Sequence, residues 1–268
     1  MSFWSGQTEL QQLLNNVSLP WVTALKRYGD NLLTTTVSGF SDGWGGFSDR
    51  VVWDDSFNGD FNYPTAATAI QISSSSAGNT GLTFAITGLD TNWDFQTENI
   101  TTDAVNGQTA VTGTNSYRRI FSMQYIGTTT PGFGDIYLST NGAAVPGGTP
   151  AAGDRLSKTR NDTGYKSQNG TYTIRNNYEG LVLGFRLSAY NSTTAYSADG
   201  ALFLKDNEGN MSVEQQYAYV NTLDNGTVDM IFPTPIYVRE KTDISVMATA
   251  SNNAAKVSCA LYIMETPA

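Results

Sequence analysis

The chain of 268 residues contains no histidine, and this absence excludes several kinds of active site. Ser-His-Asp and Cys-His catalysis need an imidazole, as do most zinc sites and pH switches near neutrality. The chain has a single cysteine, Cys259, so it cannot form an internal disulfide. Cys259 alternates with Val257, Leu261 and Ile263, and this spacing predicts a buried thiol on the inner face of a strand.

Basic residues and long apolar runs are also scarce. The chain has 15 Lys and Arg against 24 Asp and Glu, which gives a formal net charge of −9. A surface this negative repels phosphate backbones, so we expect no nucleic-acid partner. No apolar run is long enough to cross a bilayer, and the first residues lack the basic and apolar regions of a signal peptide. We therefore expect no membrane partner and no leader.

What the chain does have, from Thr65 onward, is a recurrence of apolar residues at every second position, separated by clusters of Gly, Ser, Thr, Asn and Asp. This spacing is typical of strands with one buried face. The segments that show it are residues 70–72, 82–86, 121–125, 136–138, 181–187, 228–232, 244–248 and 257–263. We predict an all-β fold of two antiparallel β-sandwiches of jelly-roll type, at residues 65–142 and 171–268. Residues 143–170 are expected to form a loop or linker.

Residues 1–64 have a different character. Residues 8–11 fit a capping box, and the apolar side chains of residues 10–17 recur at helical spacing. Residues 39–64 are rich in Gly, Asp and aromatic side chains. We predict an extended, partly helical N-terminal arm whose tryptophans bury against a partner or a neighbouring copy. These partner-binding candidates are Trp4, Trp21, Trp44 and Trp53.

Three groups of oxygen-bearing side chains are candidates for chemical sites. Asp54 and Asp55 could form the carboxylate pair of a glycosidase, but adjacent residues of a strand point to opposite faces. Calcium could use the oxygens of residues 206–210 or of Asp42 and Asp49. The spacing at 206–210 favours a turn held by Asx hydrogen bonds instead. We therefore predict no catalytic residues, no metal and no cofactor.

Several spaced motifs resemble those of a known group of proteins. They are ITGLDTNWDFQTENITT at 86–102, PGFGDIYLSTNG at 131–142 and FPTPIYVREKTDISVMATAS at 232–251. In this order they resemble the β-sandwich or jelly-roll modules of virion structural proteins of marine bacteriophages, including cyanophages, over roughly residues 65–268. The resemblance implies a non-enzymatic virion protein, either a capsid decoration or minor capsid protein or a neck, tail or baseplate accessory. It supplies no catalytic residues, and it does not cover the arm.

A virion location predicts other virion proteins as partners. A closed homo-oligomer, with a trimer favoured, would protect the edge strands of the sandwiches. We expect that deleting residues 1–64 abolishes incorporation into particles while the remainder still folds. The alternative is a receptor- or carbohydrate-binding module of a tail fibre or baseplate, since 14 Tyr and 5 Trp could stack on sugars. The aromatic density of the arm favours protein contacts over a sugar platform.

Overall fold

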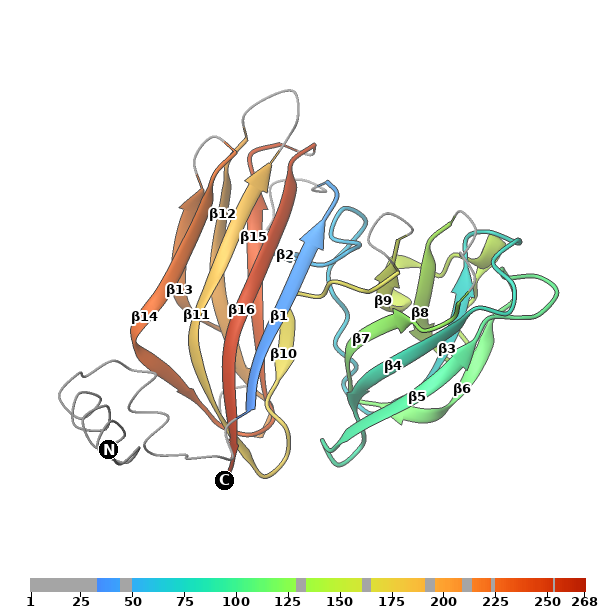
Figure 1. Ribbon diagram of the computed structural model, residues 1–268, viewed down its shortest axis with the longest axis horizontal. Coiled ribbons are helices and arrows are strands. Elements are labelled where there is room, and N and C mark those ends of the chain that lie inside the picture. Colours follow the sequence, from blue (N-terminus) through green and yellow to red (C-terminus); the bar gives the residue numbers. More distant parts are fainter. Residues whose placement is uncertain are drawn as a thin grey trace, which may run out of the picture.

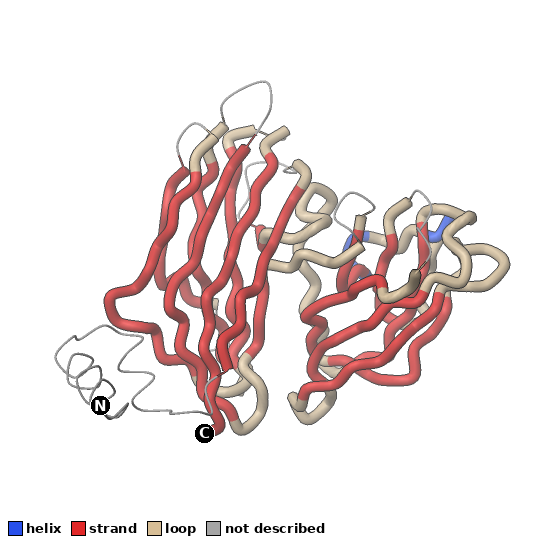
Figure 2. The backbone as a smooth tube through the Cα atoms, viewed as in Figure 1, coloured by secondary structure: helices blue, strands red, loops and turns tan. Residues whose placement is uncertain are grey.

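The computed structural model describes residues 33–43, 50–128, 134–160, 165–190, 196–208, 214–222, 225–252 and 254–268. Within these ranges sixteen strands form antiparallel sheets, and the helical elements are two short 3-10 turns, Pro146–Gly148 and Ala152–Asp154 (Figure 2). The prediction of an all-β antiparallel fold is confirmed. The helical part predicted for the arm lies outside the described residues. In the described part of the chain, no helix has the length and apolar character needed to span a membrane.

Seven consecutive strands form a two-layered unit, which we call the inserted unit (Figure 1). One layer has the strand order β6-β3-β8-β9 and the other has the order β5-β4-β7. The strands are β3 (Thr68–Ser74), β4 (Thr83–Leu89), β5 (Phe95–Thr101), β6 (Val111–Tyr117), β7 (Arg119–Tyr125), β8 (Ile136–Thr140) and β9 (Arg155–Thr159). Side chains from both layers, such as Ile72, Phe84 and Leu138, share one core. The alternation predicted at residues 82–86 is confirmed, with Phe84 and Ile86 fully buried.

The remaining strands form a second two-layered unit, which we call the main unit. One sheet has the order β1-β16-β11-β14, and the other has the order β10-β15-β12-β13 with the short β2 beside β15. The strands are β1 (Leu33–Ser41), β2 (Arg50–Val51), β10 (Thr171–Thr173), β11 (Tyr178–Tyr190), β12 (Ala198–Asp206), β13 (Gln215–Thr222), β14 (Thr227–Val238), β15 (Thr242–Ala250) and β16 (Lys256–Pro267). Residues of both sheets, including Phe185, Val246 and Leu261, pack into one core.

The inserted unit lies in sequence between β1 and β10, so the main unit is assembled from two separate stretches of the chain (Figure 1). This corrects the predicted arm at residues 1–64. Residues 33–41 pair with β16 along their whole length, and residues 50–51 pair with β15. The following residues up to 64 contact both units, through a small core at Met247 and through ion pairs with β9. The β-branched Thr and Val residues of the segment LTTTVSGFS favour a strand over an extended arm. Deleting residues 1–64 would remove β1 and β2, so the remainder is no longer expected to fold.

Gly39 in β1 lies in close contact with two other backbone segments of the main unit. A Cβ atom on Gly39 would lie 2.2 Å from the carbonyl oxygen of Val52 and 2.6 Å from the backbone nitrogen of Gly170. Three backbone segments therefore approach one another at a point that only glycine allows. Such an approach requires β1 to stay within the main unit.

The predicted linker at residues 143–170 is also corrected, because it contains β9. This strand pairs with β8, and all five of its residues are buried. Its basic side chains lie inside because Asp55 forms ion pairs with both Arg155 and Lys158. Sequence periodicity could not identify β9, since buried ion pairs replace the apolar residues that such a strand usually carries.

One buried ion pair joins the two units. Arg119, at the start of β7, donates from Nε and from Nη2 to the two carboxylate oxygens of Asp243 in β15, each at 2.7 Å. Arg119 is 5% exposed and Asp243 is 3% exposed. The guanidinium carbon lies 4.9 Å from the ring centre of Trp93 and 5.2 Å from that of Tyr63. A bidentate pair shielded by two rings fixes the orientation of the units.

The position predicted for Cys259 is confirmed, since its side chain is buried in the main-unit core together with Val257, Leu261 and Ile263. Burial raises the pKa of the Cys259 thiol to about 12. Almost no thiolate then exists at pH 8, and only the thiolate reacts with disulfide reagents. We expect no reaction with such a reagent in the native protein and one equivalent of reaction after unfolding in urea. Labelling of the native protein within minutes would contradict this prediction.

Candidate functional site

Of the four tryptophans predicted to bind a partner, Trp53 belongs to the described part of the chain. Trp4, Trp21 and Trp44 lie outside the described residues. Trp53 has no exposed surface, its ring packs edge-on against Phe61 at 5.3 Å between centres, and its Nε1 donates to the carbonyl oxygen of Gly59 at 3.2 Å. The structure thus corrects the role assigned to Trp53. Residues 50–64 fold back on their own chain, so this tryptophan is part of a local core.

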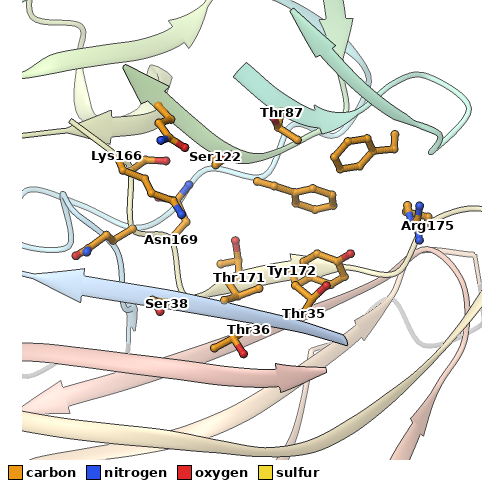
Figure 3. A pocket seen from close by; sticks show the side chains of 16 residues that line it. Thr35, Thr36, Ser38, Thr87, Ser122, Lys166, Asn169, Thr171, Tyr172 and Arg175 are labelled. Atoms are coloured by element: carbon orange, nitrogen blue, oxygen red, sulfur yellow. The ribbon is translucent and has the colours of Figure 1, made fainter. Parts of the chain in front are cut away.

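A cleft between the two units is a candidate site (Figure 3). Its volume is about 590 Å³. One wall comes from β1 of the main unit, the opposite wall from β4, β5 and β7 of the inserted unit, and the floor from residues 166–175. The main lining side chains on these three sides are Thr36, Ser38, Phe95, Phe121, Asn169 and Tyr172.

Three aromatic rings form a row across the cleft. Phe121 stacks on Tyr172 with 4.7 Å between ring centres, and Phe95 lies 6.3 Å from Phe121. Phe95 is 54% exposed, so its ring is available to a molecule that enters. The hydroxyl of Tyr172 donates to Oε2 of Glu265 at 2.9 Å. Burial, reinforced by the Glu265 carboxylate, raises the pKa of Tyr172, which therefore stays neutral and serves as a fixed part of the wall.

The wall that β1 contributes to the cleft is the outer edge of this strand. The backbone N–H of Phe40 donates to the carbonyl oxygen of Gln168 at 3.4 Å, so one end of this edge is already hydrogen-bonded to the floor of the cleft. Further toward the start of the strand, Thr36 and Ser38 are exposed and line the cleft. The cleft thus opens where the pairing with Gln168 ends.

The charges of the cleft are few. Its charged lining side chains are Lys166 and Arg175, and none of the described lining residues is a carboxylate. Arg175 is neutralised by Glu265, with a nitrogen–oxygen distance of 3.1 Å, and it lies 3.8 Å from the ring of Tyr178. This arrangement offers hydroxyls, amides, backbone groups and aromatic faces. It suits binding rather than proton transfer, because no acid–base pair faces the cleft.

The carboxylates considered as a glycosidase pair have structural partners. Asp55 is 1% exposed and is held by Arg155 and Lys158, and Asp54 accepts from the backbone N–H of Gln168 at 2.6 Å. They line a smaller hollow of about 320 Å³ together with Asp135 and Asp42, whose partners are Lys158 and Arg160. These ion pairs connect residues 42–55 to β9 and its following turn.

The acidic turn after β12 has the predicted Asx geometry. The backbone N–H of Glu208 donates to Oδ1 of Asp206 at 2.9 Å, and Glu208 pairs with Lys241 at 2.7 Å. Asn207 donates to Asp243 at 2.8 Å, so it supports the buried pair with Arg119. Among the described residues, no group of three or more acidic or Cys side chains is placed to hold a metal ion.

Sequence patterns did not identify the cleft. One wall comes from residues 35–38, which belong to the predicted arm, and much of the floor comes from residues 166–170, which belong to the predicted linker. Phe121 falls in the predicted strand at residues 121–125, whereas Phe95 falls in none of the predicted strands. Nothing in their spacing indicates that they face another unit.

Comparisons with known proteins give a limited result. No family model matches the chain, and no curated protein matches it. Among solved structures, the chain is similar to the T=1 particles derived from infectious bursal virus, with 14% identity, 92% of this chain and 74% of that chain covered, and a TM-score of 0.21. For the VP2 subviral particle of infectious bursal disease virus the values are 15% identity, 87% and 71% coverage, and a TM-score of 0.21. TM-scores this low do not establish a shared fold.

Proposed function

We propose that this chain is a non-enzymatic structural protein of a virus particle, more specifically of a bacteriophage, where it serves as a capsid decoration or minor capsid protein or as a neck or tail accessory. The observation that carries the proposal is the strand order of the main unit. Numbered along the chain without the short β2, its strands lie in the order 1-8-3-6 in one sheet and 2-7-4-5 in the other. This order supports an eight-stranded jelly roll, an architecture of viral capsid and lectin domains.

The way the chain uses its charged residues supports a passive role. Asp54 and Asp55, the carboxylates considered for catalysis, are buried and hydrogen-bonded or ion-paired. Arg119 and Asp243 are likewise committed to holding the two units together. A rigid scaffold of this kind suits permanent contacts within a particle, and the motifs at 86–102 and 232–251 that resemble virion proteins agree with that role.

A surface for such contacts lies on the side of the main unit away from the inserted unit, where β13 and β14 are the edge strands (Figure 1). Tyr217 and Tyr219 of β13 are 48% and 54% exposed, and Ile231 of β14 is 62% exposed. Tyrosine is enriched at protein interfaces because it combines a large apolar ring with a polar tip. We propose that this surface contributes to a homo-oligomer, with a trimer favoured.

The location is tested by purifying virus particles and quantifying the chain in them by mass spectrometry and gel densitometry. We expect the chain to co-purify with the particle at a fixed stoichiometry. Hundreds of copies would indicate a decoration protein of the head, and a few copies would indicate a neck or tail accessory. Absence of the chain from purified particles would refute the proposal.

The oligomer surface is tested with the double variant Tyr217→Ser/Tyr219→Ser. Because both side chains are exposed, we expect the free energy of unfolding to change by no more than about 0.5 kcal/mol per site. Loss of two interfacial aromatic side chains should weaken self-association about tenfold or more in analytical ultracentrifugation. The matched control is Tyr190→Ser, a tyrosine 55% exposed at the end of β11 in the other sheet. An unchanged oligomer in the double variant would show that the contact lies elsewhere.

A further inference from the structure

The outer edge of β1 presents backbone groups to the cleft. In an antiparallel ladder, alternate residues direct their N–H and C=O groups to opposite sides of the strand. The N–H of Phe40 points away from β16, since it donates to Gln168. The N–H groups of Thr36 and Ser38, which share its parity, therefore point to the same outer edge. Both residues line the cleft, so their donors and acceptors face it.

The sequence of β1 contains none of the features that usually protect an edge strand. Exposed edges are protected from further pairing by prolines, bulges and charged side chains. β14, the other edge of this sheet, has Pro233 and Pro235 within a bulge, where the pairing with β11 jumps from Ile236 to Ile231. β1 is uncharged, has no proline, and pairs with β16 over nine residues without a register shift. Its outer edge is therefore regular enough to accept another strand.

The inserted unit restricts what can reach this edge. It stands opposite β1 and leaves a cleft of about 590 Å³, bounded along β1 by four consecutive residues, 35–38. Four residues of a strand span about 13 Å. A folded sheet from another molecule would collide with the inserted unit if it paired with β1. A single extended segment could lie between the two walls of the cleft. Across from β1, the outer edge of that segment would face Phe95, Phe121 and Thr87.

We propose that the cleft binds one extended polypeptide segment of another virion protein, which adds to the main-unit sheet as a strand alongside β1. The segment bonds through its backbone to Thr36 and Ser38, and the aromatic row lies along its other side. None of the described lining residues is an Asp or Glu that could pair with a Lys or Arg of the segment, so we expect neutral or acidic side chains at this point. This inference rests on the proposed function and names the surface through which the chain holds a partner.

The first test is hydrogen exchange on the full chain, free and in purified particles, resolved to single amides by fragmentation. In the free chain, the amides of Thr36 and Ser38 should exchange faster than those of Thr35 and Val37, which bond to β16. In particles, the outer amides should become protected. If the chain is present in particles and these amides exchange as they do in the free chain, strand addition is wrong while the virion role stands. If the chain is absent from particles, the proposed function itself fails.

The second test compares Ser38→Pro with Ser38→Ala. Proline removes the outward N–H of this residue without removing a bond to β16, and an edge position of a strand tolerates it. Alanine removes the hydroxyl and keeps the N–H. We expect incorporation into particles to fall about tenfold or more for Ser38→Pro and to be unchanged for Ser38→Ala, with the melting temperature of each variant as a check on folding. Incorporation of both variants at the level of the unmodified chain would overturn the proposal.

Loss of incorporation in both variants would also overturn it. That result would indicate that the hydroxyl of Ser38 is recognised, as in a sugar-binding or side-chain contact. Should Ser38→Pro unfold, the exchange measurement on the unmodified chain still decides the question.

Discussion

Replacing Arg119 with alanine is expected to lower the free energy of unfolding by about 3–5 kcal/mol, measured by urea denaturation. The variant leaves the carboxylate of Asp243 buried without its ionic partner, and among the described residues Thr173 and Asn207 still donate to it. The packing of the guanidinium between Trp93 and Tyr63 is lost as well. Since this residue joins the two units, we also expect their unfolding transitions to separate. Arg119→Lys should not rescue the variant, because a lysine cannot form the bidentate pair.

The matched control is Arg186→Ala, which breaks the ion pair with Asp229. Its nitrogen–oxygen distance of 2.6 Å is as short, but the two side chains are 49% and 42% exposed. Water screens that pair, so its loss should lower the free energy of unfolding far less than Arg119→Ala does. The double variant Arg119→Ala/Asp243→Ala should lose less than the sum of the two single variants, because no unpaired buried charge remains. Equal losses for Arg119→Ala and Arg186→Ala would contradict the buried connection.

Trp53→Ala is expected to destabilise the isolated chain by about 3–5 kcal/mol, since it removes a fully buried indole and leaves a cavity beside Phe61. Thermal and urea unfolding of the purified protein measure this loss directly. The expectation separates two roles for the same residue. A tryptophan that only contacts a partner would be exposed in the free chain, and its removal would leave the stability of that chain almost unchanged.

Phe57→Ala serves as the comparison for Trp53→Ala. Phe57 belongs to the same segment and is 53% exposed, so its truncation should change the free energy of unfolding by no more than about 0.5 kcal/mol. A small effect for both variants would return Trp53 to the role of a partner contact.

The strands that sequence predicts well are those with one apolar face. Residues 181–187 and 257–263 alternate clearly, and the structure forms β11 and β16 there. The hydrophobic effect makes such patterns readable, because each second side chain has to leave water. The alternation is visible within one short segment of sequence. It therefore identifies a strand but not the strands that pair with it.

Strands that bury polar residues were not recognised. Arg155 and Lys158 are inside because Asp55, about a hundred positions earlier, lies opposite them. β1 was assigned to an arm because its partner β16 lies at the other end of the chain. The cleft has the same origin, since Thr36, Phe121 and Tyr172 meet only after the units have docked. No window of sequence contains both sides of such a contact.

The pairing of β1 with β16 has a consequence for how the chain is made. A ribosome would deliver the whole inserted unit before β10–β16 exist, and domains generally fold as units as they emerge. The inserted unit can therefore complete its core early, while β1 waits for the last residues to be synthesised. Pairing between such distant segments is slow, because the loop must close before any contact is gained. A chain stopped before residue 257 would carry a finished inserted unit beside a bare strand, ready to pair with whatever strand it meets.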